Sequence, residues 1–134
     1  TRRLSSAASD VYKRQPKYDW EEGGVTYASI RTCSLSEGKS VADLPANDSI
    51  WNKYLDDYGF EGGVWRWWPE TGSATTFTHD YWNVASFRSV EEYGAGRDAR
   101  LQAMMADTRP EEIHDCDTPR LYKSTNIRLS VAES

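Results

Sequence analysis

The sequence predicts an α+β fold built from two helices and four strands. Two segments carry apolar residues at steps of three and four, as amphipathic helices do, and four others are rich in β-branched and aromatic residues between turn formers. The length of 134 residues fits one domain. Aromatic residues make up 13% of the chain, with six tryptophans, which indicates a substantial packed core or an aromatic-lined cavity.

The first fifteen residues are set apart from the rest of the chain. Residues 5–15 resemble a translated sequencing adapter, and their last six match the codons GAT GTG TAT AAG AGA CAG. We therefore predict a disordered, non-native tail over residues 1–15 and a single domain over residues 16–134.

The first strand is expected over residues 25–33, a run rich in β-branched and aromatic residues. Alternate residues of a strand point to opposite faces. The face with Ala28 and Ile30 is small enough to admit a helix close by, whereas the opposite face, with Tyr27 and Arg31, is larger and more polar. We expect the helices on the Ala28 face.

A first helix follows. Ser40 and Asp43 resemble a capping box, and an apolar stripe at helical spacing continues to about Tyr58. Pro45 interrupts the pattern. It lies either in the first turn of the helix or at a break, after which a second piece restarts near Asp48.

Two strands and a second helix complete the middle of the chain. Residues 64–68 and 75–87 read as strands, and the linker at 69–73 has the composition of a hairpin loop, so the two should be antiparallel neighbours. Ser89 followed by Glu92 forms a second capping box, which opens a helix that ends near Ala106.

The last part of the chain is expected to return to the sheet. Residues 108–111 can start a short extra turn, and residues 121–129 alternate as a fourth strand. The resulting order, β-α-β-β-α-β, is the ferredoxin-like pattern. It predicts a four-stranded antiparallel sheet in the order four, one, three, two, with both helices on one face. The bare aromatic-rich face then favours a homodimer.

Three short segments resemble a known superfamily. Residues 33–40, residues 82–89 and the glycines around Ala95 are similar to uncharacterised microbial members of the dimeric α/β-barrel superfamily, whose relatives include antibiotic-biosynthesis monooxygenases, EthD-like proteins and NIPSNAP proteins. The resemblance covers the element order from about residue 25 to residue 129. It implies that two subunits pack sheet against sheet and that ligands bind between sheet and helices or at the interface.

The two cysteines are expected to lie close together. If the fourth strand pairs with the first, Cys33 and Cys116 fall at the same end of the sheet. They then form either a disulfide, which implies an oxidising compartment such as the periplasm, or two reduced, half-buried thiols. The sequence leaves the localisation open between the cytoplasm and the periplasm.

Groups that can bind a metal ion lie around the same cysteines. His114, Asp115, Cys116 and Asp117 together with Cys33 offer zinc-binding groups. Their spacing fits no established site, and consecutive residues of one loop do not all converge on one ion. We therefore predict no metal and a solvated loop.

A candidate ligand pocket follows from strand alternation. His79, Tyr81 and Asn83 share one face of the third predicted strand. The candidate catalytic residues are His79, Tyr81, Asn83 and Arg31, and the candidate ligand-binding residues are Tyr27, Trp65 and Trp67. Together they would bind a planar aromatic or carboxylated ligand or stabilise an enolate. Alternatively, the aromatic rows are ordinary sheet packing.

The composition narrows the function. A net charge of -5 argues against nucleic acid as a partner, and no apolar run reaches the length of a membrane span. The sequence has no phosphate-binding loop or nucleophile elbow, so we expect no cofactor. Two functions stay open: a small-ligand-binding dimeric barrel with oxygenase-like, cofactor-independent chemistry, and a non-catalytic binding or interaction module whose sheet face is filled by side chains.

Overall fold

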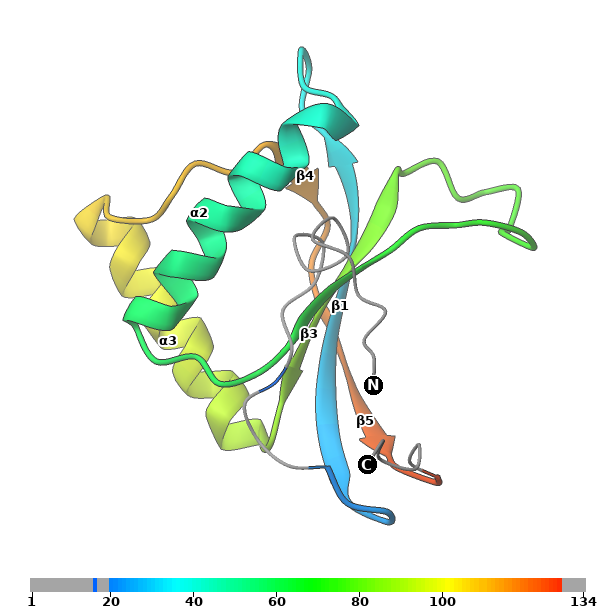
Figure 1. The fold of residues 1–134 in the computed structure, drawn as a ribbon, viewed down its shortest axis with the longest axis vertical. Helices are drawn as coiled ribbons and strands as arrows, with labels where there is room; N and C mark the ends of the chain where they lie inside the picture. Colours follow the sequence, from blue (N-terminus) through cyan, green and yellow to red (C-terminus); the bar gives the residue numbers. More distant parts are fainter. Residues whose placement is uncertain (1–15, 17–19, 129–134) are drawn as a thin grey trace, which may run out of the picture.

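The computed structural model describes residue 16 and residues 20–128. The adapter-like segment of residues 1–15 lies outside the described residues, as does the end of the last predicted strand at Leu129. The predicted α+β fold is confirmed: two helices pack on an antiparallel sheet (Figure 1). The sheet has five strands instead of four, so the chain is not a clean β-α-β-β-α-β arrangement.

The sheet is organised around its longest strand, β1. On one side β1 pairs with β3, which in turn pairs with β2, and on its other side β1 pairs with β4 and β5. All these pairings are antiparallel. If β4 and β5 are counted as one strand, the strand order is the predicted one: four, one, three, two. The bounds of the strands are β1 Val25–Leu35, β2 Val64–Trp67, β3 Tyr81–Phe87, β4 His114–Cys116 and β5 Arg120–Thr125.

Where one strand was predicted beside β1, over residues 121–129, the structure has two, β4 and β5, which are separated at Asp117. The Asp117 backbone N–H donates to the carbonyl of Thr32 (3.0 Å), and its carboxylate accepts from the Thr32 N–H (2.8 Å). The Asp117 carboxylate thus accepts a hydrogen bond that a backbone carbonyl would accept in a regular β-ladder. Pro119 has no N–H to donate, so regular pairing resumes only at Arg120.

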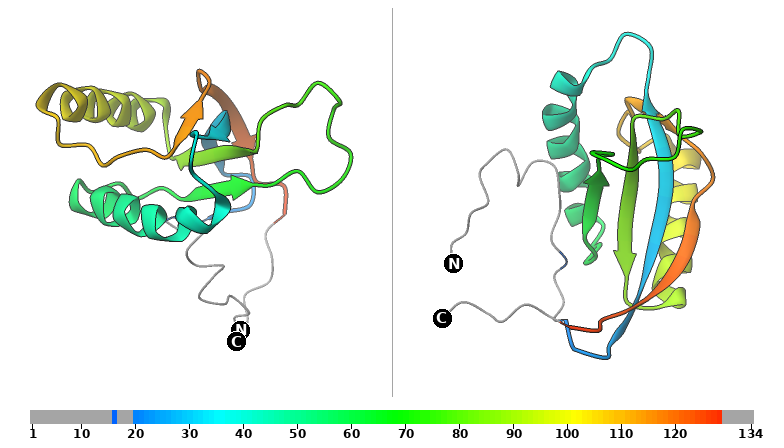
Figure 2. Two further views of the ribbon diagram at one scale, coloured as in Figure 1. Left: turned by 90° about the horizontal axis from the view of Figure 1, so that it is seen from above. Right: turned by 90° about the vertical axis from the view of Figure 1, so that its right-hand side faces the viewer.

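Both helices lie on the same face of the sheet, as the sequence predicted (Figure 2). A short 3₁₀ turn, η1 (Val41–Asp43), leads into α2 (Leu44–Asp57), and Pro45 occupies the first turn of α2. The helix therefore does not restart at Asp48. Proline is tolerated there because the first N–H groups of a helix have no partner within the helix.

The second helix begins where its capping residues predict. In α3 (Val90–Ala106) the Ser89 hydroxyl accepts from the Glu92 N–H (3.0 Å), while the Glu92 carboxylate accepts from the Arg88 N–H (2.8 Å). Asp107, in the left-handed region at φ 57°, ends the helix. The extra turn expected at residues 108–111 is not helical.

The third predicted strand starts six residues later than expected. Residues 75–80 belong to a loop, and Asp80 holds its end: the Asp80 N–H donates to the Cys33 carbonyl (2.9 Å), and its carboxylate accepts from the Leu35 N–H (2.8 Å). These bonds occupy the end of β1. The connection between β2 and β3 is therefore much longer than the predicted hairpin loop at 69–73.

The helices cover the opposite face of β1 from the one expected. Ser29 and Arg31 face α2 and α3, whereas Ala28 and Ile30 lie on the outer face. The covered face carries the long side chains of Arg31 and Arg66, which project into the space between the sheet and the helices. The result is a cavity between the layers instead of close packing.

Candidate functional site

A cavity of about 210 Å³ separates the sheet from the helices. Its walls come from β1, β2, β3, α2, α3 and the segment 109–119. Cavities for drug-sized ligands usually measure about 300–1,000 Å³, so this one suits a small ligand. Segment 109–119 is attached to α2 at one end of the cavity: the Glu111 carbonyl accepts hydrogen bonds from the side chains of Asn47 and Trp51 (both 3.0 Å).

Aromatic rings form a continuous wall from α2 to α3. Neighbouring rings lie with centroids 5.2–6.4 Å apart, mostly tilted or edge to face. In order along the wall they are Trp51, Tyr54, Tyr58, Phe60, Phe87 and Tyr93. Such a surface packs well against a flat apolar or aromatic group.

The charged groups of the cavity are mostly cationic. Five arginines line it against two carboxylates, a net charge of +3 with the histidine neutral, although the chain as a whole carries -5. These residues are Arg31, Arg66, Arg97, Arg100 and Arg109, with Asp48 and Glu112. The lining therefore has the opposite sign to the protein.

Three of the arginines form ion pairs with carboxylates of the protein itself. Arg66 makes a two-pronged pair with Asp48 of α2, with N–O distances of 2.7 and 3.0 Å, and its guanidinium lies 5.0 Å from the ring centre of Tyr81. Arg100 and Arg109 both donate to one oxygen of Glu112, at 3.0 and 3.1 Å. Because Glu112 carries one negative charge and the two arginines carry two positive charges, this cluster keeps a net charge of +1.

Arg31 differs from these arginines because its guanidinium makes no hydrogen bond or ion pair with any residue that the structure describes. It is half-buried, and its register partner on β3 is Asn83, which also lines the cavity. Burial lowers the pKa of Arg31 below its ordinary value, and Arg100 lowers it further, while Glu112 opposes the shift. A cation in this position is prepared to receive an anion.

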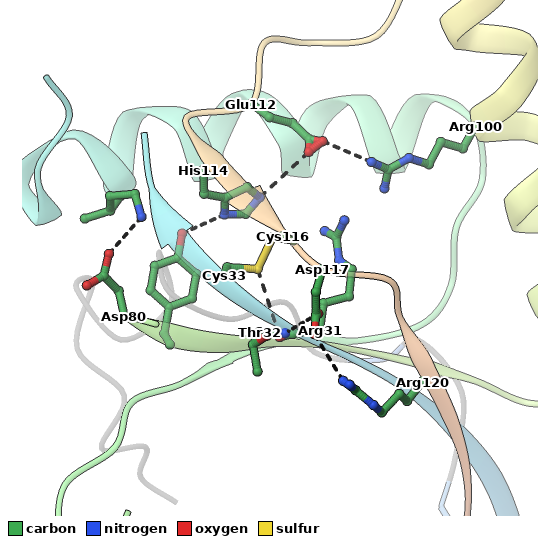
Figure 3. The surroundings of a disulfide bond; sticks show 12 residues. Arg31, Thr32, Cys33, Asp80, Arg100, Glu112, His114, Cys116, Asp117 and Arg120 are labelled. Atoms are coloured by element: carbon green, nitrogen blue, oxygen red, sulfur yellow. Dashed lines mark hydrogen bonds and ion pairs between the residues drawn. A yellow bond between two sulfur atoms is a disulfide. The ribbon is translucent and has the colours of Figure 1, made fainter. Parts of the chain in front are cut away.

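His114 adds a neutral imidazole to the cavity. Its Nδ1 lies 2.6 Å from the hydroxyl of the buried Tyr81, and its Nε2 lies 3.9 Å from Glu112 Oε1 (Figure 3). Burial lowers the pKa of His114, and the charge of Arg31 lowers it further. Burial also raises the pKa of Tyr81. We assign the phenol as donor to Nδ1, which leaves the imidazole proton on Nε2.

The structure brings together only some of the predicted site residues. Arg31 and Asn83 line the cavity, and Tyr81 reaches it through His114. Tyr27 lies on the same face of β1 but is not part of the wall. His79 precedes β3 and is exposed, with its ring 5.8 Å from that of Phe77.

The two predicted tryptophans lie on the outer side of the sheet. Arg66, between them, points toward α2, so Trp65 and Trp67 alternate to the opposite face. Trp65 still borders the cavity, whereas Trp67 is half-exposed and does not.

Cys33 and Cys116 are joined by a disulfide, with Cα atoms 4.1 Å apart. They are register partners on β1 and β4. The bond belongs to a small core with Leu44, Tyr81 and Ile113, directly beneath His114 (Figure 3). Most of the charged lining was missed at the sequence level because Asp48, Arg100 and Glu112 are far apart in the chain.

Comparisons with protein-family models, with curated proteins and with solved structures find no match to this chain. Within residues 20–128, no helix is both long and apolar enough to cross a membrane. The chemistry of the cavity is therefore the basis for the functional proposal.

Proposed function

We propose that this protein binds a small organic anion in the cavity between its sheet and its helices. The observation that carries the proposal is the half-buried Arg31 guanidinium, which has no ion-pair partner among the described residues. A buried charge without a partner is unfavourable, and a ligand carboxylate would supply the missing counter-charge. The positive lining of the cavity supports the same ligand charge.

The body of the ligand should be apolar and flat. The wall from Trp51 to Tyr93 consists of packed aromatic rings, and the volume of about 210 Å³ favours a small molecule. An aromatic carboxylate combines both features. The cavity supports ligand binding over an interaction module whose interior is filled.

The test is calorimetric titration with 2-naphthoate and with 2-naphthamide, which share a ring system and differ in charge. A hydrogen bond to a charged group contributes about 1.5–3 kcal/mol, so the acid should bind roughly tenfold or more tightly than the amide. Added salt should weaken only the acid. Equal affinities, or no binding of either compound, would contradict the proposal.

A second candidate function is oxygenase-like catalysis without a cofactor. The observation that favours it is the Tyr81–His114 hydrogen bond beside Arg31 in one cavity. To act as the base, the His114 Nδ1 lone pair would have to exchange the Tyr81 hydroxyl for the acidic C–H of an enolisable ligand, and Arg31 would stabilise the enolate. An enolisable aromatic ketone should then cause oxygen consumption that is lost in His114→Gln. Binding of 2-naphthoate without oxygen consumption would identify a non-catalytic binding protein.

The outer face of the sheet supports a homodimer that packs sheet against sheet, as in the ferredoxin-like dimeric α/β barrels that the sequence resembles. Trp67 and Trp82 are register partners on this face, and Phe77 stacks on Trp82 with a centroid distance of 4.2 Å. Trp67 is half-exposed. A contiguous aromatic surface of this kind is typical of an interface.

Sedimentation velocity tests the dimer. The wild-type protein should sediment as a dimer at micromolar concentration, and Trp67→Glu should shift it to a monomer, because a charge would be buried at the interface. Met105→Glu is the control, since Met105 is 79% exposed on α3, away from the sheet. A wild-type monomer would overturn the dimer and leave the ligand proposal intact.

A further inference from the structure

We propose that reduction of the Cys33–Cys116 disulfide creates a binding site for a divalent zinc-like metal ion, formed by the two thiolates and the His114 imidazole. The two sulfur atoms and one imidazole nitrogen all lie within 4.8 Å of one another. Thiolate and imidazole are the ligands that Zn²⁺ prefers in proteins. The site shares His114 with the wall of the ligand cavity, but the metal proposal holds whether or not an anion binds there.

The backbone holds these three side chains together without help from the sulfur–sulfur bond. Cys33 and Cys116 are register partners of the β1–β4 ladder. His114 and Cys116 are two residues apart on β4, so their side chains point to the same face. Reduction leaves the ladder hydrogen bonds in place, and the three groups stay on one face of the sheet.

The distances suit tetrahedral zinc. Bonds of about 2.3 Å to sulfur and 2.0–2.1 Å to nitrogen place the ligand atoms of a tetrahedral site roughly 3.6–3.8 Å apart, so after reduction the two sulfur atoms must move away from each other to bind the metal. The Tyr81 hydroxyl lies 2.6 Å from His114 Nδ1 and Glu112 Oε1 lies 3.9 Å from Nε2, so when one nitrogen binds the metal, the other nitrogen still has a polar neighbour. Groups of this kind orient a ligating histidine from outside the coordination shell. His114 lines the cavity, so a water molecule can fill the fourth position.

The state of the sulfur–sulfur bond decides whether the metal binds. A dithiol reductant transfers two electrons to the protein disulfide and becomes a disulfide itself, leaving Cys33 and Cys116 as thiols. When the metal binds, both thiols deprotonate and two protons are released. In the oxidised protein neither sulfur is a thiolate, so only the imidazole remains as a ligand.

The test is a Co²⁺ titration of the reduced protein after the dithiol has been removed by gel filtration under argon. One Co²⁺ per chain should bind, with a thiolate-to-cobalt charge-transfer band and the intense visible bands of a tetrahedral site, and Zn²⁺ should displace it. The oxidised protein should show neither band. Absence of the charge-transfer band in the reduced wild-type protein would overturn the proposal.

Two histidine variants separate this site from unspecific thiol binding. His114→Gln keeps both cysteines, and because losing an outer-shell partner alone weakens metal binding about 10–100-fold, its Kd for Co²⁺ should rise at least tenfold. His79→Gln changes the only other histidine, which is exposed and outside the cluster, and should bind as the wild type does. Equal affinities of the two variants, or Co²⁺ binding only to a chain that far-ultraviolet circular dichroism shows to be unfolded, would overturn the proposal.

Discussion

Arg31 and Arg66 show how one residue type serves two purposes on the same face of one sheet. Arg66 lies against Asp48 with both side chains largely buried, at 7% and 15% exposure, so its charge is satisfied within the fold. Arg31 is half-buried and has no ion pair with any residue in the described part of the chain. The first arginine therefore stabilises the contact between β2 and α2, and the second is left for a ligand.

This difference predicts opposite effects on stability. Asp48→Asn removes the counter-charge from the buried Arg66 guanidinium, which should lower the free energy of unfolding by about 3–5 kcal/mol. Arg31→Gln removes a charge that has no partner, so the free energy of unfolding should stay the same or rise. Urea denaturation of the ligand-free proteins measures both. A larger loss for Arg31→Gln than for Asp48→Asn would refute the two roles.

His114 should titrate below its ordinary pKa of about 6.5 in the disulfide-bonded protein, because burial and Arg31 disfavour the imidazolium. The unfolded chain binds the proton more readily than the folded one. Stability contributed by the neutral imidazole is thus complete above about pH 6.5 and is lost as the pH falls toward the folded pKa. Proton NMR of the imidazole C–H signals measures the pKa, and His79→Gln assigns them. A His114 pKa at or above the ordinary value would contradict the burial described.

Replacing glycine by alanine should have opposite effects on stability at two positions, one just before β2 and one inside α3. A Cβ at Gly62, just before β2, would collide with the Ser86 carbonyl oxygen of β3 and with the Phe60 ring. Gly62→Ala should therefore destabilise the protein by about 1–3 kcal/mol. Gly94, inside α3, has open space at its Cβ position, so Gly94→Ala should stabilise by about 0.5–1 kcal/mol. Thermal unfolding followed by circular dichroism measures both, and a stabilising Gly62→Ala would refute the close approach of β2 to β3.

Elements with strong local signals were predicted well. Ser89 and Glu92 marked the start of α3, and the β-branched run from Val25 marked β1. The short β4, residues 114–116, was missed because three polar or small residues show no alternation that a strand pattern would reveal. The prediction for β3 was too long because the threonines before Asp80 have high strand propensity, whereas the Phe77 N–H donates to the Ala74 carbonyl and closes a turn there.

The candidate site was harder to predict than the elements. Tyr81, Asn83 and Arg31 were placed on common faces because strand alternation is a local rule. Which face the helices cover depends on packing across the whole sheet, and the small Ala28 face was wrongly chosen. Arg97 and Arg100 of α3 fit a helical pattern equally well on an exposed face, so their position in the cavity wall had no sequence signal.

The disulfide connects distant parts of the protein and should contribute to its global stability. It joins residues 83 positions apart, so it restricts the unfolded chain strongly. A native disulfide of this kind contributes about 2–5 kcal/mol. Urea unfolding with and without a dithiol reductant should show a loss of that size. Identical midpoints in the two conditions would mean that the β1–β4 ladder holds without the covalent link.

The protein combines an acidic chain, at -5, with a cavity lining of +3. Removing one lining charge should therefore affect the binding of an anion far more than removing one surface charge. Arg120→Gln is the matched control for Arg31→Gln, because Arg120 is the register partner of Ile30 and its side chain lies on the opposite face of the sheet.

Titration of 2-naphthoate into these two variants examines the proposed role of Arg31. Loss of one member of a buried charge pair costs about 2–5 kcal/mol, so Arg31→Gln should weaken naphthoate binding roughly 30-fold or more. Arg120→Gln should bind naphthoate as the wild-type protein does. Equal naphthoate affinities for wild type, Arg31→Gln and Arg120→Gln would contradict the assignment of Arg31 as the counter-ion of a bound anion.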